Sequence, residues 1–330
     1  MNVGIIGCGV IGRRRAQHLA GARLVHCVDP DLPRASELAS GSPGCTFGAD
    51  WRHLVDRMDD VEAIVIATPH DLQAEIVSAA IDAGKHVLVE KPAARNAGEL
   101  EGLAQRAARR NVRVRVGFNH RYHRAFQQAR RLVDAGVLGP LLFVRARYGH
   151  GGRPGYAGEW RAQPARSGGG ELIDQGIHLI DLARWFLGEF VDVSGFVHTY
   201  FWDMPVEDNG FMLLKTASKQ VAFLHAGCTE WKNTFCWELV GRDGKLQVDG
   251  LGGSYGVEKL TFYKMLPQMG PPETTIWEYP MADNSWTMEM ADFIEDIRAR
   301  REPCAGLQDA IAALAIVGKI YAESARDHRA

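Results

Sequence analysis

Short apolar runs alternate with helical patterns through the first part of the chain. The runs at residues 2–6 and 24–28 begin this alternation. The run at 61–67 is apolar throughout, as expected for a strand that is buried on both faces of a parallel sheet. Strands that alternate with helices predict an α/β fold with a doubly wound parallel sheet. Further strands are expected at 45–47, 86–89 and 112–118, and helices at 35–39, 51–57, 72–83 and 99–110.

From residue 122 onward the pattern changes to strands that are joined by short turns. Residues 217–219 and 241–244 have the composition of hairpin turns. The sequence therefore predicts a second domain, 120–330, with an α+β fold and a large, mostly antiparallel, open-faced sheet. The expected helices are 126–135, 286–301 and 307–325, and the expected strands are 141–148, 191–201, 210–216, 220–229, 234–240, 245–248, 259–263 and 274–279.

Aromatic residues of this second domain bear on its assembly. An open antiparallel sheet with exposed aromatic side chains favours a homo-oligomer in which two sheets pack face to face. The alternative is that helices cover this face of the sheet. The aromatic candidates are Phe201, Trp202, Phe235 and Trp237.

A strongly apolar stretch at residues 168–187 begins with three glycines and ends at Gly188. Asp174 and His178 are among its few polar residues, and their spacing puts them on one face of a helix, one turn apart. A proton-transfer site needs an imidazole that titrates near neutrality and a carboxylate that fixes its charge state. The alternative is a solvated stripe, because other polar residues also fall at helical spacing. These are Glu171, Gln175, Asp181 and Arg184.

Composition and charge argue against several function classes. The chain has 330 residues, enough for two domains, and its 46% hydrophobic and 24% charged residues are ordinary for a globular protein. A formal net charge of -2 gives no reason to expect nucleic acid or a membrane surface as a partner. No apolar run reaches the length that spans a bilayer. The six cysteines are scattered, which predicts reduced thiols in a cytoplasmic protein and no metal site.

The motif Gly7-Cys8-Gly9-Val10-Ile11-Gly12 lies between the first expected strand and a helical pattern. In such a turn the first glycine allows the tight bend, the second lets a pyrophosphate approach, and the third lets the helix pack against the strand. Asp29 ends the second strand about 20 residues on, where an acid binds the ribose hydroxyls and repels a 2'-phosphate. The sequence therefore predicts a Rossmann domain, 1–119, that binds NAD, with NADP possible.

Polar residues follow the ends of several expected strands in this domain. They are Asp29, Thr68, Lys91 and Asn119. Ligands of doubly wound sheets bind beyond the carboxyl ends of the strands, so these residues are expected to share one rim with the glycine motif. A lysine at that rim can hydrogen-bond a substrate oxygen beside a nicotinamide. The alternative for Lys91 is a surface lysine that pairs with Glu90.

Taken together, these motifs resemble the Gfo/Idh/MocA family (glucose–fructose oxidoreductase, inositol dehydrogenase, rhizopine catabolism). The resemblance covers the whole chain and rests on GCGVIG at 7–12, EKP at 90–92, GFNHRY at 117–122, EWR at 159–161 and the glycine-led helix at 168–188. It implies an NAD(P)-dependent oxidoreductase that acts on sugars, cyclitols or sugar nucleotides. It also implies an N-terminal Rossmann domain, a C-terminal domain with an open sheet, and assembly as a homodimer or homotetramer.

The resemblance also implies roles for individual residues. Lys91 matches the EKP lysine, which contacts nicotinamide and substrate, and Asp174 and His178 match the acid/base pair. One segment departs from the family, since His70 and Gln73 stand where it often has Asn and His. The implied cofactor contacts are Gly7, Gly9, Val10, Ile11, Gly12, Asp29, Thr68, Pro69, His70, Glu90, Lys91, Asn119, Trp160 and Arg161.

The implied reaction is reversible oxidation of a hydroxyl to a ketone, with a hydride passing to or from the nicotinamide. His178, held by Asp174, moves the hydroxyl proton, and Lys91 hydrogen-bonds the same oxygen. Substrate selectivity is expected from the 149–170 loop and neighbouring strands. The implied substrate contacts are Lys91, Arg121, Tyr148, His150, Arg153, Tyr156, Asp174 and His178.

Five arginines near this rim leave the substrate's charge open. Some could clamp a phosphate or carboxylate of a sugar nucleotide or sugar acid, or they bind the cofactor or pair with acids. They are Arg145, Arg147, Arg153, Arg161 and Arg166. Two other functions are considered. One is a lyase or glycosidase that oxidises its substrate transiently with tightly bound NAD. The other is a non-catalytic NAD(P) sensor, which has no need of a proton relay.

Overall fold

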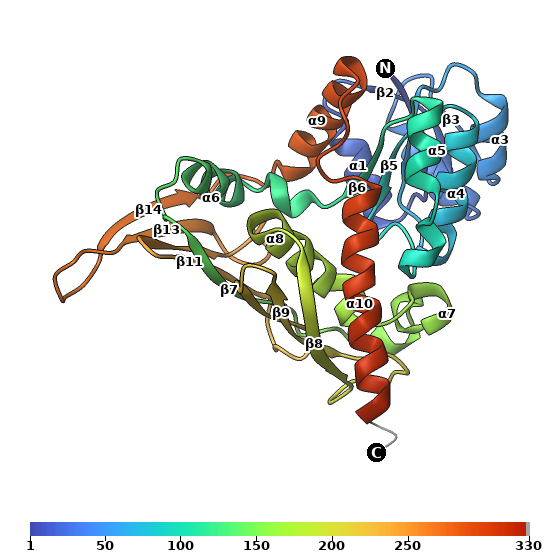
Figure 1. Ribbon diagram of the computed structural model, residues 1–330. Helices are drawn as coiled ribbons and strands as arrows, with labels where there is room; N and C mark the ends of the chain where they lie inside the picture. Colours follow the sequence, from blue (N-terminus) through green and yellow to red (C-terminus); the bar gives the residue numbers. More distant parts are fainter. Residues whose placement is uncertain (328–330) are drawn as a thin grey trace. The chain divides into compact units, whose positions relative to one another are not determined.

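The computed structural model describes residues 1–327, and the chain forms two compact units (Figure 1). The first unit comprises residues 1–118 and 286–312. The second comprises 119–285 and the rest of the described chain. Within the described residues, no helix combines the length and the apolar character needed to cross a membrane.

Residues 286–312 pack with the first unit, whereas the expected division places them in the second domain. Helix α9 (Ser285–Ala299) carries most of them. Its buried Met290 and Phe293 join the hydrophobic core of the first unit. Its Glu289 accepts a hydrogen bond at 2.5 Å from Arg15, which is also buried. Because sequence patterns do not reveal such long-range pairs, the division could not be read from the order of elements alone.

The first unit contains a six-stranded sheet in the order β3-β2-β1-β4-β5-β6, with neighbouring strands parallel. The predicted doubly wound α/β fold is therefore confirmed. Its strands are β1 (Asn2–Ile6), β2 (Arg23–Val28), β3 (Thr46–Gly48), β4 (Ala63–Ile66), β5 (His86–Glu90) and β6 (Val114–Gly117). Its other helices are α1 (Val10–Gln17), α2 (Leu32–Ser40), α3 (Trp51–Arg57), α4 (His70–Asp82) and α5 (Leu103–Arg110).

The helix expected at 99–110 is wrong in its first part. A short 3-10 turn, η1 (Ala97–Leu100), comes first, and α5 begins only after Gly102. Gly102 has a φ of +74°, a left-handed conformation that interrupts a right-handed helix and that glycine adopts without strain.

The second unit contains an eight-stranded sheet in the order β14-β13-β12-β11-β7-β10-β9-β8. One neighbouring pair, β7 and β10, is parallel and the others are antiparallel, as predicted. The strands are β7 (Leu141–Gly149), β8 (Phe190–His198), β9 (Asn209–Thr216), β10 (Val221–Gly227), β11 (Thr234–Gly241), β12 (Gly244–Asp249), β13 (Glu258–Lys264) and β14 (Glu273–Tyr279). The helices are α6 (Arg124–Asp134), α7 (Pro164–Ser167), α8 (Ile177–Leu187) and α10 (Leu307–Asp327), which begins in the first unit.

Helices α6 and α8 cover one face of this sheet (Figure 1). Phe126 of α6 contacts both Phe235 and Trp237 of β11, with ring centroids 5.8 and 5.7 Å apart. The expectation that Phe235 and Trp237 are exposed is therefore wrong, because both point into the covered face and are buried. Side chains alternate along a strand, so the other parity forms an open face. Its exposed apolar residues include Phe196, Leu213 and Phe223.

The strand expected at 191–201 ends earlier, at His198. The following segment turns because the backbone N–H groups of Tyr200, Phe201 and Trp202 donate to the buried carboxylate of Asp208, at 2.9, 2.7 and 3.0 Å. Burial by itself would raise the pKa of Asp208, but these donors lower it below its ordinary value. A buried carboxylate that collects three donors therefore replaces strand pairing here.

Candidate functional site

The three motif glycines of the first unit have different local environments. Gly7 has a φ of +92°, and a Cβ there would lie 2.5 Å from the carbonyl oxygen of Ala67. A Cβ at Gly12 would lie 1.8 Å from the carbonyl oxygen of Gly7. A Cβ at Gly9 would meet no described atom within 4 Å, so this side of the turn is open. A tight bend, close helix packing and open space before helix α1 suit a bound pyrophosphate.

Asp29 connects the glycine turn to the turn that follows β2. Its Oδ2 accepts a hydrogen bond from the backbone N–H of Cys8 at 2.8 Å, inside the glycine motif. Its Oδ1 accepts from the backbone N–H of Asp31 at 2.9 Å. Asp29 therefore shapes the loop that would receive the ribose, in addition to any contact with the ribose itself.

The remaining predicted rim residues of the first unit follow β4 and β5. Thr68 and Pro69 lie between β4 and α4, and His70 is the buried first residue of α4. Lys91 follows Glu90, the last residue of β5. Glu90 Oε1 accepts from Arg15 Nε at 2.6 Å, so this carboxylate is tied to helix α1. This geometry favours a structural role for Glu90 over the predicted cofactor contact.

The polar side chains of the second unit's apolar helix are buried, not solvated. Glu171, Asp174, His178 and Asp181 are between 1% and 6% exposed. The alternative of a solvated stripe is therefore wrong for these four residues. The helix begins with a π-helical turn, Leu172–Gly176, and continues as α8. Such π turns are rare and frequent at functional sites.

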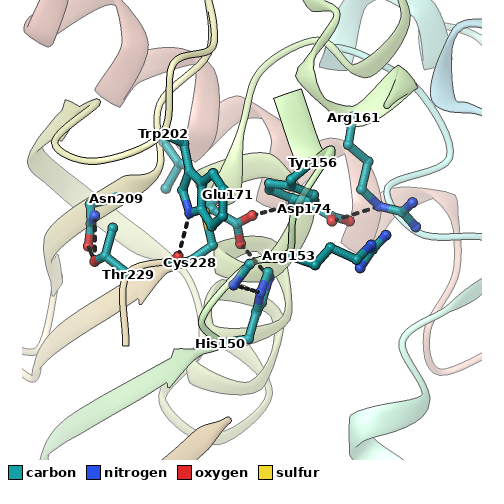
Figure 2. A network of polar contacts seen from close by, with 12 residues as sticks. His150, Arg153, Tyr156, Arg161, Glu171, Asp174, Trp202, Asn209, Cys228 and Thr229 are labelled. Atoms are coloured by element: carbon teal, nitrogen blue, oxygen red, sulfur yellow. Dashed lines mark hydrogen bonds and ion pairs between the residues drawn. The ribbon is translucent and has the colours of Figure 1, made fainter. Parts of the chain in front are cut away.

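Two carboxylates at the start of this helix have defined partners (Figure 2). Asp174 Oδ2 accepts from Arg161 Nε at 3.1 Å. Glu171 Oε1 accepts from the hydroxyl of Tyr156 at 2.6 Å, and Glu171 Oε2 lies 3.5 Å from His150 Nε2. The predicted 149–170 loop thus reaches the helix through three side chains, and it binds two carboxylates that are one turn apart.

These contacts change proton affinities in the loop. Burial raises the pKa of Tyr156 strongly, and the charges of Glu171 and Asp174 raise it further. Burial would lower the pKa of His150, but the same carboxylates outweigh it and the pKa is raised. The backbone N–H of Gly152 donates to His150 Nδ1 at 3.0 Å. In the neutral imidazole the proton is therefore on Nε2, facing Glu171.

The other predicted substrate and cofactor residues of this unit lie in the same neighbourhood. The Tyr148 ring is 6.2 Å from that of His178, centroid to centroid. Arg121 binds both oxygens of Asp181, at 2.8 and 2.6 Å, which gives it a role in holding the helix. Asn119 Nδ2 donates to Ser285 Oγ at 3.0 Å. The guanidinium of Arg161 stacks on the indole of Trp160, 4.6 Å from the ring centroid.

Most of the five arginines are already paired or point elsewhere. Arg145 binds Glu238 at 3.1 Å and Arg153 binds Glu159 at 2.6 Å, while Arg161 holds Asp174. Arg145 and Arg147 have the parity of the open face, opposite to Tyr148, so they do not line the α8 side of the sheet. The pairing of arginines with acids is thus the interpretation that the structure favours for Arg145, Arg153 and Arg161.

The glycines that begin the helix admit two other segments. A Cβ at Gly169 would lie 1.9 Å from the hydroxyl of Tyr321 in α10, and a Cβ at Gly170 would lie 1.9 Å from the carbonyl oxygen of Glu207. Glu207 Oε1 accepts from Tyr321 Oη at 2.7 Å and from the backbone N–H of Leu172 at 3.1 Å. The start of the helix that carries Asp174 and His178 is therefore set by Glu207 and Tyr321.

We expect Glu207→Gln to change how stability depends on pH. Burial raises the pKa of Glu207 from 4.5 to about 6, even though Tyr321 and backbone N–H groups lower it. Glu207 therefore binds its proton more tightly in the folded protein than in the unfolded chain. Its contribution to the free energy of unfolding falls as pH rises from 4.5 through about 6. The glutamine oxygen can accept both hydrogen bonds without this cost. As pH rises through that range, the free energy of unfolding of the variant should increase relative to that of the parent by about 2 kcal/mol.

Urea unfolding of parent and variant, at pH values below and above this range, measures the difference. Glu278→Gln on the exposed edge strand β14 is the matched control, for which the difference should not vary with pH. A flat difference for Glu207→Gln would contradict the prediction.

Three of these residues were missed by sequence reasoning as site components. Glu171 carried a signal, because it precedes Asp174 by three residues and His178 by seven, on the same helical face. Glu207 and Tyr321 carried none, since they meet the helix only through the tertiary fold. The described residues hold no cluster of three His, Cys, Asp or Glu that could bind a metal ion.

Known proteins share both the sequence and this architecture. Residues 1–118 match the family model described as "Oxidoreductase family, NAD-binding Rossmann fold", and residues 126–247 match the "GFO/IDH/MocA C-terminal domain". The dTDP-3,4-didehydro-2,6-dideoxy-alpha-D-glucose 3-reductase of Actinomadura kijaniata is 32% identical over 250 residues, 74% of each chain. Levoglucosan dehydrogenase of Pseudarthrobacter phenanthrenivorans is 32% identical over 229 residues, 66% of this chain and 58% of that protein.

The match thus spans less than two thirds of the levoglucosan dehydrogenase sequence. A solved structure named "Levoglucosan dehydrogenase, complex with NADH" has the same fold, with a TM-score of 0.90 at 24% identity over 99% of this chain and 97% of that one. The resemblance inferred from the motifs is confirmed, and the first unit is an NAD-binding Rossmann domain. The chain belongs to the Gfo/Idh/MocA oxidoreductase family.

Proposed function

We propose that the protein is an NAD(P)-dependent oxidoreductase that interconverts a hydroxyl and a ketone on a sugar, sugar nucleotide or cyclitol. The observation that carries the proposal is the buried pair Asp174 and His178 at the start of α8, in a chain with an NAD-binding Rossmann domain. When bound, the nicotinamide supplies the hydride acceptor or donor. The names of relatives, which include levoglucosan and inositol dehydrogenases, support a carbohydrate substrate.

In this proposal the chain's own side chains manage the proton. His178 takes it from the substrate hydroxyl, because imidazole is the side chain that titrates nearest to neutral pH. Asp174, itself held by Arg161, favours the charged imidazolium that results. Lys91 donates a hydrogen bond to the same substrate oxygen and stabilises the developing negative charge.

The arginine contacts bear on how a phosphate or carboxylate of the substrate would be bound. A phosphate clamp needs guanidinium groups that can turn both donors to the ligand. Arg153 and Arg161 already bind Glu159 and Asp174, and a phosphate would have to displace those carboxylates.

The test is a screen for reduction of NAD and NADP, in which the absorbance of the reduced nicotinamide is the readout. The panel contains anhydrosugars, inositols, free sugars and nucleotide-linked sugars, and Lys91→Met and His178→Asn are run beside the parent. Turnover that both substitutions abolish supports the proposal and names the substrate class. Substrate loss without net reduction, with cofactor that co-purifies, favours transient oxidation and elimination instead. NAD binding without turnover of any compound favours a sensor.

Asp29→Asn is expected to weaken NADH binding and to reduce the ratio of the affinity for NADH to the affinity for NADPH. The amide keeps one acceptor for the two backbone donors, and it no longer repels a 2'-phosphate. Hydrogen bonds to charged groups are worth about 1.5–3 kcal/mol, so affinity for NADH should fall roughly tenfold or more. Fluorescence titration with both reduced cofactors measures the Kd values without a substrate. Asp31→Asn, an exposed acid on the same loop, should leave both values near those of the parent.

The open face of the eight-stranded sheet supports assembly as a homodimer or homotetramer. Phe223 pairs with Leu213 on neighbouring strands β10 and β9, and both are 52% exposed. Phe196 on β8 is 50% exposed on the same sheet. Apolar side chains on one sheet face mark an interaction surface. Sedimentation velocity of the intact chain tests this part of the proposal.

A further inference from the structure

His120 of the GFNHRY motif has been given no role so far. It lies in a short 3-10 turn, η2 (Asn119–Tyr122), and is buried. Its ring is stacked on the ring of His178, with centroids 3.8 Å apart and an angle of 14° between the planes. Stacking at this distance is direct contact between two nearly parallel imidazoles.

The His120 ring is itself held from several sides. Tyr148 of β7 and Phe235 of β11 meet it edge-on, at centroid distances of 5.1 and 6.1 Å. His123 also meets it edge-on at 5.6 Å, and His123 Nδ1 lies 2.9 Å from Glu258 Oε2. Strands and a helical turn therefore immobilise His120, so its ring is a fixed surface for a neighbour.

A catalytic imidazole must be held in one orientation, and a stacked ring is one way to hold it. The terminal torsion of histidine is broad, so a helix backbone alone does not fix the plane of the ring. A general base must also lie within hydrogen-bond reach of the proton that it takes, and small misplacements reduce rates strongly. One face of the His178 ring is covered by the His120 ring.

We propose that His120 is a positioning residue, which holds the ring plane of His178 by parallel stacking. This inference rests on the proposed function, because it assigns His178 the proton-transfer role. It adds a second support for His178 to the sequence-based interpretation, in which Asp174 holds His178. It also predicts that a flat apolar ring can replace His120, whereas an apolar side chain without a flat face cannot.

The kinetic test compares His120→Phe with His120→Leu, which are both apolar and differ in having a planar ring. The leucine variant should lower kcat roughly tenfold to a hundredfold, with the KM for substrate and the Kd for NADH near the parent values. The phenylalanine variant should retain kcat within about threefold. Equal unfolding temperatures show that both variants fold. Full kcat in the leucine variant, or an equal loss in both variants, would overturn the proposal.

A second readout needs no substrate. A ring stacked on His178 shifts its Cε1–H and Cδ2–H signals upfield in proton NMR, and these signals are assigned by their loss in His178→Asn. The shift should persist in His120→Phe and disappear in His120→Leu. Unchanged signals in the leucine variant would overturn the proposal. Failure of the proposed function looks different, because the parent itself would then turn over no substrate.

Discussion

Replacement of His178 by asparagine should lower kcat by about 10²–10⁴-fold while the Kd for NADH stays unchanged. His178 is 5% exposed, so water cannot easily substitute for the imidazole as proton acceptor. Asparagine keeps a polar side chain of similar reach but cannot take a proton near neutral pH. Because the interaction is made with the reacting oxygen, the loss should fall on kcat more than on KM. Steady-state kinetics with the substrate from the screen measures both.

The matched control is His225→Asn on β10. His225 is also partly buried and stacked on an aromatic ring, that of Phe211 at 4.5 Å, and it hydrogen-bonds Asn209. It belongs to the open-face parity of the sheet, so its loss should not reduce kcat. A kcat for His178→Asn within threefold of the parent would contradict the proton-transfer role.

Replacement of Arg15 by methionine should destabilise the first unit by about 3–5 kcal/mol. Burial disfavours the charge on Arg15, but Glu90 and Glu289 outweigh it and its pKa is raised. The substitution leaves two buried carboxylates without this partner, and it also removes the guanidinium that stacks on Trp286 at 4.3 Å. Urea unfolding followed by fluorescence measures the loss.

Two further variants separate charge from packing. Arg13 lies two positions before Arg15 on α1 and forms an ion pair with Glu37 in which both groups are exposed. Arg13→Met removes that pair and should change the free energy of unfolding little. Combining Arg15→Met with Glu289→Gln removes one of the stranded charges and should recover part of the stability. If Arg13→Met costs as much as Arg15→Met, burial is not the cause.

The helix that carries Asp174 and His178 depends on segments that are far apart along the chain. Glu207 and Tyr321 bind its first turn, Arg161 binds Asp174, and His120 covers His178. Two of the glycines before the helix are explained by these partners, because Tyr321 and the Glu207 carbonyl approach Gly169 and Gly170 closely. A substitution at Glu207 therefore acts on the site through the start of the helix, whereas one at His120 acts on the His178 ring itself.

The sequence by itself determined the fold class, the glycine turn and the position of the helix that carries Asp174 and His178. These follow from local patterns: apolar runs of strand length, the GxGxxG spacing, and polar residues at helical intervals in an apolar segment. Turn motifs and the periodicity of a helix depend on residues that are neighbours along the chain. They can therefore be read without knowledge of the tertiary fold.

Only the tertiary structure decided which side chains are buried together. It placed 286–312 with the first unit through Arg15 and Glu289, and it buried Phe235 and Trp237 beneath α6 and α8. It also brought Glu207 to the start of the helix. Each of these contacts joins residues that are distant in sequence, and whether a polar side chain is solvated, paired or stacked depends on which segments pack against it.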